Sequence, residues 1–201
     1  MGPKLRVVAI VSSARRRGNC NDIAERMLAR LAEKGVDTEA IRTPDYDINP
    51  CNRCSYECFS EDAACPIEDD VPRIWEKMKQ ADGIVLAIPS YYGLPPAIFK
   101  AIIERAQGIL GWVTDEFRDL DSVWKGKPIV AAVVADGGGE TIVKYLRRLL
   151  SGAHVISEHF SYARLGRPGY GGGLMELHEV ASRVDELAEE MYLKLISNAG
   201  R

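Results

Sequence analysis

Five apolar, β-branched segments recur along this chain, and each is followed by a segment with helical periodicity. The apolar segments span residues 5–11, 36–41, 83–88, 129–134 and 154–162. The helical segments span residues 22–34, 72–80, 96–107, 141–150 and 174–196. Such alternation is typical of an α/β fold, a parallel sheet with helices on both faces and right-handed crossovers. For five strands we expect a doubly wound sheet in the order 2-1-3-4-5.

A doubly wound sheet also predicts where a ligand binds. The site lies at the carboxyl ends of the first and third strands, where the strand order reverses. The 201 residues contain no internal repeat, no low-complexity segment and no linker. We therefore expect one domain over residues 1–201, with a cysteine-rich loop at residues 44–70.

Charge and the N-terminal sequence narrow the class of partner. The net charge is −3 and the arginines at 15–17 form a local cluster, so we expect no nucleic-acid partner. The first residues lead directly into a strand, and no apolar run is long enough to span a bilayer. These features predict a cytoplasmic protein without membrane association. In a reducing compartment, the five cysteines are expected as metal ligands or reactive thiols rather than disulfides.

The first loop, residues 12–21, has the composition of an anion site. A short loop between a strand and a helix leaves unpaired N–H groups at the helix start, and these attract anions. Ser12, Ser13, Asn19 and Asn21 would add polar donors, and the three arginines would add positive charge. Neither G-x-G-x-x-G nor G-x-x-x-x-G-K-[ST] is present, which argues against a dinucleotide site and a P-loop. We interpret the loop as a phosphate cradle; the alternative is a solvated basic turn.

Two more loops are predicted at the same edge of the sheet. Residues 89–95 read P-S-Y-Y-G-L-P, with Tyr91 and Tyr92 beside a glycine that allows close approach of the backbone. Residues 136–141 read D-G-G-G-E-T, so backbone amides would face a ligand. Amides suit the polar edge of a flavin ring, and aromatic side chains suit its faces. Packing without a ligand is the alternative interpretation of the two tyrosines.

The three loops resemble those of the NAD(P)H-dependent FMN reductase family. The resemblance rests on Ser12-Ser13 with Gly18-Asn19, on P-S-Y-Y-G-L-P-P-A-I-F-K-A-I-I-E-R and on A-D-G-G-G-E-T. It implies a flavodoxin-like fold, bound FMN, NAD(P)H as electron donor, and a homodimer or homotetramer. It places the phosphate and ribityl chain against Ser12, Ser13, Arg17, Gly18, Asn19, Asn21 and Cys20, which stands where the family often has threonine. It places the isoalloxazine beside Pro89, Ser90, Tyr91, Tyr92, Gly93, Asp136, Gly137, Gly138 and Gly139.

Four of the five cysteines have the spacing C-x2-C-x3-C-x6-C. Cys51, Cys54, Cys58 and Cys65 are close enough in sequence to hold one metal centre, and four thiolates suit an iron–sulfur cluster or zinc. The segment resembles the cysteine motif of iron–sulfur flavoproteins, a branch of the same family, which implies a [4Fe-4S] cluster. One extra residue in the second gap makes Cys58 the weakest match. Zinc, and thiols without a metal, are the alternatives.

The loop around these cysteines contains few large apolar residues and has no clean periodicity. Such a loop has no core of its own, so we expect a metal centre to order it. Glu104 and Arg105, on the helix after the second ligand loop, are expected to form a solvated charge pair.

Together these features predict an FMN-dependent oxidoreductase that passes electrons between FMN and an iron–sulfur cluster. The redox chemistry would belong to the cofactors, and no catalytic acid–base residue is expected. NAD(P)H or a ferredoxin-like protein would donate the electrons. Two alternatives remain: a cluster-free NAD(P)H-dependent FMN or quinone reductase, and a non-enzymatic metal-binding interaction module.

Overall fold

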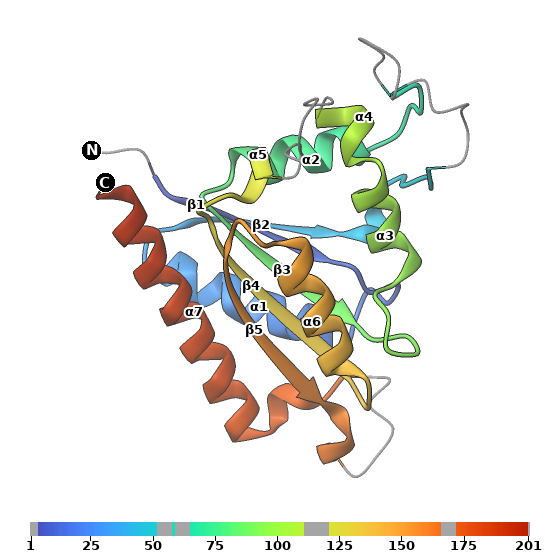
Figure 1. The fold of residues 1–201 in the computed structure, drawn as a ribbon. Helices are drawn as coiled ribbons and strands as arrows, with labels where there is room; N and C mark the ends of the chain where they lie inside the picture. The colour runs from blue at the N-terminus through green and yellow to red at the C-terminus, as the bar shows by residue number, and fades with distance from the viewer. Residues whose placement is uncertain (1–3, 52–57, 59–64, 111–120, 166–171, 201) are drawn as a thin grey trace.

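A parallel sheet of five strands forms the centre of the molecule (Figure 1). The computed structural model describes residues 4–51, 58, 65–110, 121–165 and 172–200. The strands are β1 (Arg6–Val11), β2 (Asp37–Arg42), β3 (Gly83–Pro89), β4 (Pro128–Ala135) and β5 (His154–Ser161). Every neighbouring pair is parallel, and the order is β2-β1-β3-β4-β5. The predicted doubly wound, flavodoxin-like topology is therefore confirmed.

Helices cover both faces of this sheet (Figure 1). The longer ones are α1 (Asn19–Glu33), α2 (Val71–Gln80), α3 (Ala97–Glu104), α6 (Gly139–Leu149) and α7 (His178–Ala199). The short ones are η1 (Thr43–Asp45), α4 (Ala106–Leu110), α5 (Asp121–Trp124), η3 (Tyr162–Leu165) and η5 (Leu174–Glu176). α1 and α7 pack on one face, and α2, α3 and α6 pack on the other. Among the described residues, no helix combines the length and the apolar character needed to cross a bilayer.

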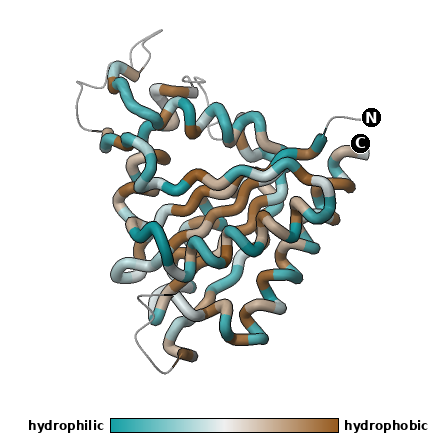
Figure 2. Tube along the Cα trace, turned by 180° about the vertical axis from the view of Figure 1, so that it is seen from behind, coloured by the Kyte–Doolittle hydropathy of each residue, from teal (hydrophilic) through white to brown (hydrophobic). Residues whose placement is uncertain are grey.

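The central strands β3 and β4 are the most deeply buried. All of β4, and all of β3 except its last residue, are buried, as expected for strands covered by helices on both sides. In Figure 2, these strands have the colour of hydrophobic residues and lie at the centre of the molecule. Successive side chains alternate between the two faces: Val85 packs with α1 and α7, and Leu86 packs with α2 and α3.

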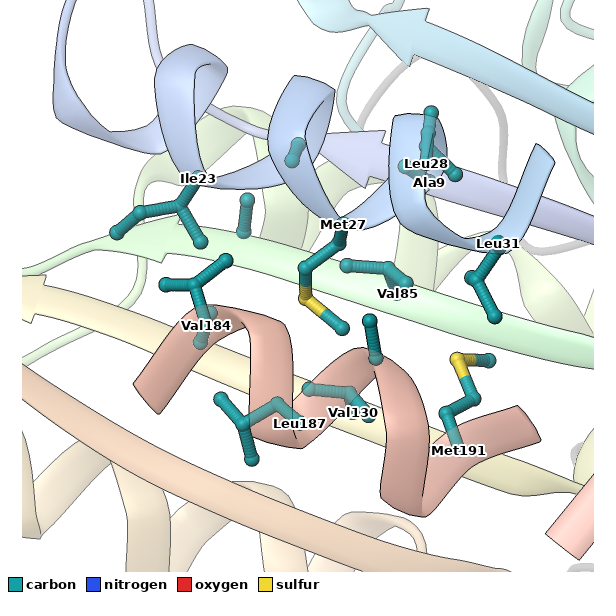
Figure 3. Close-up of a cluster of buried hydrophobic side chains, with 14 of the residues drawn as sticks. Ala9, Ile23, Met27, Leu28, Leu31, Val85, Val130, Val184, Leu187 and Met191 are labelled. Atoms are coloured by element: carbon teal, nitrogen blue, oxygen red, sulfur yellow. The ribbon is translucent and has the colours of Figure 1, made fainter. Parts of the chain in front are cut away.

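The face formed by α1 and α7 has a continuous apolar seam. Figure 3 shows Met27 of α1 and Leu187 and Met191 of α7 converging over Val85 and Val130 of the sheet. All five side chains are fully buried. Close packing of this kind leaves little room for change, because each missing methylene removes contacts and leaves a void.

Several helix boundaries differ from the sequence expectation. α1 begins at Asn19 rather than at residue 22, because the N–H groups of Asn21 and Asp22 both donate to the Gly18 carbonyl. The expected helix of residues 96–107 is two helices, since α3 ends at Glu104 and α4 begins at Ala106. The last expected helix likewise begins with the short η5, and α7 starts at His178.

Candidate functional site

A cavity of about 220 Å³ lies at the carboxyl edge of the sheet, at the ends of β1, β3 and β4. It is lined by Ser13, Arg15, Gly18, Asn19, Cys20, Pro89, Ser90, Tyr91, Val134 and Tyr162. The strand order reverses between β1 and β3 at this edge, so the cavity occupies the predicted position. Ligand pockets usually hold about 300–1,000 Å³, so a larger ligand would extend beyond the cavity over the sheet edge.

The two adjacent serines of the first loop have different roles. Ser13 faces the cavity, and its Oγ accepts a hydrogen bond from Arg15 N at 3.2 Å. Ser12 is fully buried, and its hydroxyl donates to the Ala87 carbonyl at 3.4 Å. Ser12 N donates to the same oxygen at 3.1 Å. Ser12, expected as a phosphate ligand, therefore links the ends of β1 and β3 and is not part of the cavity lining.

Asn19 is a buried side chain in the first turn of α1 that lines the cavity. Its Oδ1 accepts a hydrogen bond from Leu174 N at 3.0 Å. An amide whose oxygen is held in this way presents N–H groups to its other neighbours. Gly172 lies against the same turn, because a Cβ built on it would be 3.0 Å from Asp22 Oδ2. The segment that follows residue 171 thus packs against the first loop and fixes the orientation of Asn19.

Asn21 holds the backbone of the first loop through a side-chain hydrogen bond. Its Nδ2 donates to the Arg15 carbonyl at 2.9 Å, and the residue is buried. Its Oδ1 is also buried and has no hydrogen-bond partner among the described residues. Asn21, expected to contact phosphate directly, is outside the cavity lining and instead holds the backbone of the loop.

The three arginines of the loop are all exposed, but they point to different surroundings. Arg15 lines the cavity. Arg16 pairs with Asp45 in η1. Arg17, the arginine expected at the phosphate, is not in the lining. The cationic side chain placed at the cavity is therefore Arg15.

Cys20 lines the cavity from the first turn of α1. Burial raises the pKa of its thiol to about 12, and the nearby Arg15 opposes this rise. The thiol is therefore neutral at physiological pH, and it acts here as a small apolar group rather than as a nucleophile.

The second loop is a tight turn beside the cavity. Tyr91 N donates to the Leu94 carbonyl and Leu94 N donates to the Tyr91 carbonyl, both at 3.0 Å. Between them, Tyr92 and Gly93 have φ values of 55° and 77°, which is the pattern of a type I′ turn. Tyr91 lines the cavity, whereas the Tyr92 side chain is fully exposed. The turn therefore presents one aromatic ring to the cavity and one to solvent.

The third loop packs on the second at backbone distance. A Cβ built on Gly138 would lie 2.9 Å from Gly93 Cα, and Gly138 has a φ of 74°. Ser90 Oγ accepts a hydrogen bond from Gly93 N at 3.2 Å and donates to the Gly137 carbonyl at 3.5 Å. Gly139 abuts His159, because its Cβ would lie 2.2 Å from the His159 ring. Two of the three glycines are thus required by packing, whereas the sequence suggested that they serve a ligand.

Sequence reasoning missed two residues of the lining, Val134 and Tyr162. Val134 is near the end of β4, and Tyr162 directly follows β5. The signal that could have found them is their position, because residues at the carboxyl ends of parallel strands meet at one edge.

Three of the four clustered cysteines, Cys51, Cys58 and Cys65, are described, and Cys54 lies outside the described residues. Cys58 and Cys65 lie side by side, since a Cβ built on Gly108 of α4 would be 2.9 Å from Cys58 Cβ and 3.0 Å from Cys65 Cβ. In the described part of the chain, no three Cys, His, Asp or Glu side chains are grouped as a metal site. The described residues thus bring two of the predicted ligands together.

Arg105 was expected to be solvated, and this expectation is wrong. It is 1% exposed and forms an ion pair with Asp69 in which both side chains are fully buried. Asp69 also accepts hydrogen bonds from Asn49 N at 2.8 Å and Val71 N at 3.0 Å. Burial alone would raise the pKa of Asp69, but these hydrogen bonds and the guanidinium lower it below its usual value. We call this buried pair the Arg105–Asp69 latch.

Comparison with known proteins agrees with this architecture. Residues 5–165 match the family described as NADPH-dependent FMN reductase. The chain belongs to this family. It is accordingly a flavin-dependent oxidoreductase of an FMN-using, NAD(P)H-dependent group. The interpretation of the chain as a non-enzymatic metal-binding module is thereby set aside.

Relatives within the family share much of the chain. An iron–sulfur flavoprotein of Methanocaldococcus jannaschii is 32% identical over 170 residues, which are 83% of each protein. An iron–sulfur flavoprotein of Methanosarcina thermophila is 35% identical over 102 residues, or 51% of this chain and 52% of that protein. Among solved structures, an NAD(P)H:quinone oxidoreductase from Methanothermobacter marburgensis has a TM-score of 0.70 at 15% identity, covering 94% of this chain and 98% of that one. The last similarity supports the fold.

Proposed function

We propose that this oxidoreductase binds FMN at the carboxyl edge of the sheet and exchanges electrons through an iron–sulfur cluster in the cysteine loop. The observation that carries the flavin part is the cavity at the strand-order reversal, with the first turn of α1 and Asn19 in its lining. The names of the relatives and the neighbouring Cys58 and Cys65 support the cluster part.

The first loop has the chemistry to hold a phosphate. The positive end of α1 and the N–H groups of its first turn favour an anion. Ser13 supplies a hydroxyl, Asn19 an amide and Arg15 a positive charge, all in the cavity lining. Ser12, Arg17 and Asn21 would then act indirectly, through the backbone of the loop and the local charge.

The second and third loops have the geometry to border a ring. Pro89, Ser90 and Tyr91 lie in the lining, and Gly93 is locked to Gly138 across the two loops. FMN, when bound, would supply hydride and single-electron chemistry. The protein residues would orient its ring, exclude water from one face and fix its polar edge at residues 136–139. No acid–base side chain is assigned to the reaction.

Cys51, Cys54, Cys58 and Cys65 are the proposed ligands of a four-iron cluster. Thiolates are the usual ligands of such clusters, and the pair at Gly108 gives two of them a common location. NAD(P)H or a ferredoxin-like protein would donate electrons. The volume of the cavity is smaller than that of a usual ligand pocket, so part of a bound flavin would remain uncovered. A second copy of the chain that covers the flavin, in a homodimer or homotetramer, fits the same proposal.

The test is an assay of protein purified without oxygen. We expect bound FMN on chromatography, together with iron, sulfide and the broad visible absorption of an iron–sulfur cluster. Cys51→Ser should lose iron and keep FMN, whereas Cys20→Ser, in the first loop, should keep both. Full FMN without iron after cluster reconstitution would leave a cluster-free NAD(P)H-dependent FMN or quinone reductase. Zinc in place of iron would assign the cysteines a structural role.

A further inference from the structure

Arg105 is a buried cation outside the lining of the flavin cavity, at the junction of α3 and α4. Its Nη1 pairs with Asp69 and lies 3.5 Å from the Asn49 carbonyl. Its Nη2 donates to the Ile67 carbonyl at 3.0 Å and to Cys65 Sγ at 3.5 Å. These contacts reach the chain on both sides of the cysteines, at residue 49 and at residues 65–69. One side chain therefore holds both ends of the cysteine loop.

We infer that Arg105 is the positioning residue of the iron–sulfur site: it orders the cysteine loop and donates an N–H to the sulfur of Cys65. The inference rests on the proposed function, since it assigns a role toward the proposed cluster. Arg105 stands at the α3–α4 junction one turn after the buried Ala101 and Ile102, so its side chain lies on the buried side of α3 and reaches Asp69 there.

The geometry favours preorganisation of the loop. Asp69 ties Asn49 N and Val71 N together, and Arg105 adds bonds to Ile67 and Asn49. Holding two ends of a loop close removes the loop-closure part of the entropy that ligand binding would otherwise have to overcome. The sequence suggested that a metal must order this loop. In the structure, the Arg105–Asp69 latch already fixes both of its ends.

The contact with Cys65 gives the cation a second role. Cys65 N donates to the Gly108 carbonyl at 2.8 Å, so the residue is fixed through both its backbone and its sulfur. Hydrogen bonds to cluster sulfurs and nearby positive charge are main determinants of a cluster's reduction potential. A guanidinium at this sulfur would favour the reduced, more negative cluster and raise the potential.

A buried ion pair without any relation to a cluster would be the simpler explanation. Such pairs often contribute little net stability, because burial of both charges offsets their attraction. One further observation separates the two explanations. Beyond its bonds to Asp69 and Ile67, Arg105 directs an N–H at the sulfur of Cys65, one of the proposed cluster ligands, at 3.5 Å. A purely structural pair gains nothing from a bond to that sulfur.

The test compares two variants of the full-length holoprotein with one control. Arg105→Lys keeps the charge but lacks the planar fork that reaches Asp69, Ile67 and Cys65 together. Arg105→Met combined with Asp69→Asn removes both charges, so that no unpaired carboxylate remains buried. Lys100→Met is the control, because Lys100 lies on α3, its side chain is 44% exposed, and it pairs with the nearby Glu104.

Three measurements are made on each variant: FMN content, iron content, and the cluster potential by EPR-monitored titration with dithionite as the electron source. We expect unchanged FMN in all variants. Both Arg105 variants should lose iron or shift the one-electron equilibrium at least tenfold toward the oxidised cluster, which corresponds to about 59 mV. The control should match the wild type. Unchanged iron and potential in folded Arg105→Lys and in the double variant would overturn the inference.

Hydrogen exchange distinguishes failure of the inference from failure of the proposed function. If the wild type binds FMN but no iron, the cluster proposal fails. The preorganisation is then tested on the amides of Asn49 and Cys65, which donate to Asp69 and Gly108. We expect them to exchange at least tenfold faster in Arg105→Lys than in Lys100→Met. Unchanged exchange in Arg105→Lys rejects the positioning role.

Discussion

Asn19 joins two distant parts of the chain with one side chain. Its oxygen accepts from Leu174 N, and its position in the first turn of α1 places it in the cavity lining. The amide is nearly buried, so its orientation is set by the protein before any ligand binds. Preorganised donors of this kind contribute more to anion binding than flexible surface groups, because no ordering cost remains.

Asn19→Asp tests this role with an almost isosteric change. The carboxylate keeps an oxygen for Leu174 N but replaces the N–H₂ donor with an acceptor and a negative charge. We expect FMN affinity to fall ten- to a hundredfold, corresponding to about 1.5–3 kcal/mol. A fluorescence titration of reconstituted protein measures this. Arg17→Gln, at an exposed residue outside the lining, is the control and should change the affinity far less. Equal effects would place the phosphate elsewhere.

The sequence could predict the first loop but not the role of each residue in it. The sequence gives no reason to assign different roles to three adjacent arginines. In the structure, Arg16 pairs with Asp45, whereas Arg15 lines the cavity. Ser12 and Ser13 are separated in the same way by the Ala87 carbonyl. Arg105 looked like one half of a surface pair because its partner, Asp69, comes from a loop without periodicity. Contacts between distant segments decided each of these cases.

At the scale of elements, the turn between β3 and α3 stores backbone strain. Tyr92 has a φ of 55°, a region that costs a residue other than glycine about 1–2 kcal/mol. Type I′ turns prefer Asn-Gly, so Tyr92→Asn should stabilise the protein by about 1 kcal/mol and raise the Tm by about 2–4 °C. Tyr92→Phe keeps the strain and should leave the Tm unchanged. A Tyr92→Asn protein that melts lower in a thermal scan would contradict the strain argument.

The start of α6 depends on a glycine that meets a histidine of β5. A Cβ on Gly139 would lie 2.2 Å from the His159 ring, whereas a Cβ on Gly137 would meet nothing within 4 Å. Gly139→Ala should therefore cost about 1–3 kcal/mol, and Gly137→Ala should change stability by less than about 0.5 kcal/mol. In the background of His159→Ala, most of the cost of Gly139→Ala should disappear. Urea unfolding of the wild type, Gly139→Ala, His159→Ala and the double variant forms a double-mutant cycle. An undiminished cost of Gly139→Ala in the His159→Ala background would refute the clash.

Among the elements, the strands were predicted more closely than the helix ends. Buried parallel strands are continuous apolar runs in the sequence, and β3 and β4 are such runs. Helix ends depend on single contacts, such as the hydrogen bonds to the Gly18 carbonyl that start α1 early. Such contacts leave no periodic trace.

At the scale of the whole molecule, the two faces of the sheet are built differently. One face carries α2, α3 and α6, with Cys58 and Cys65 beside Gly108 of α4. The other face is covered by α1 and α7, which pack together through an apolar seam. Beside this seam, Asp185 of α7 binds two arginines of α1. Asp185 accepts two hydrogen bonds from Arg26 at 2.7 Å and two from Arg30 at 3.0 Å. These hydrogen bonds link α7 to α1.

The seam predicts a specific dependence of stability on pH. Hydrogen bonds from Arg26 and then Arg30 hold the pKa of Asp185 well below its usual range. A depressed pKa means that the unfolded state takes up a proton before the folded state does, so the stabilisation is complete above the unfolded value of about 3.9. It is lost as pH falls through the folded pKa. Acid should therefore weaken the attachment of α7.

Asp185→Asn removes the charge that titrates while keeping the size of the side chain. At pH 7 we expect it to cost about 1 kcal/mol, because bidentate partly exposed pairs lie at the upper end for surface ion pairs. Toward pH 3 and below, the difference from the wild type should shrink, since the unfolded wild type takes up a proton at Asp185 there and the folded state loses that advantage. Glu33→Gln is the control: Glu33 contacts Arg30 from an exposed position and should change little at either pH. Urea denaturation at the two pH values measures both variants, and a difference that stays constant between pH 7 and pH 3 would show that Asp185 does not titrate with the fold.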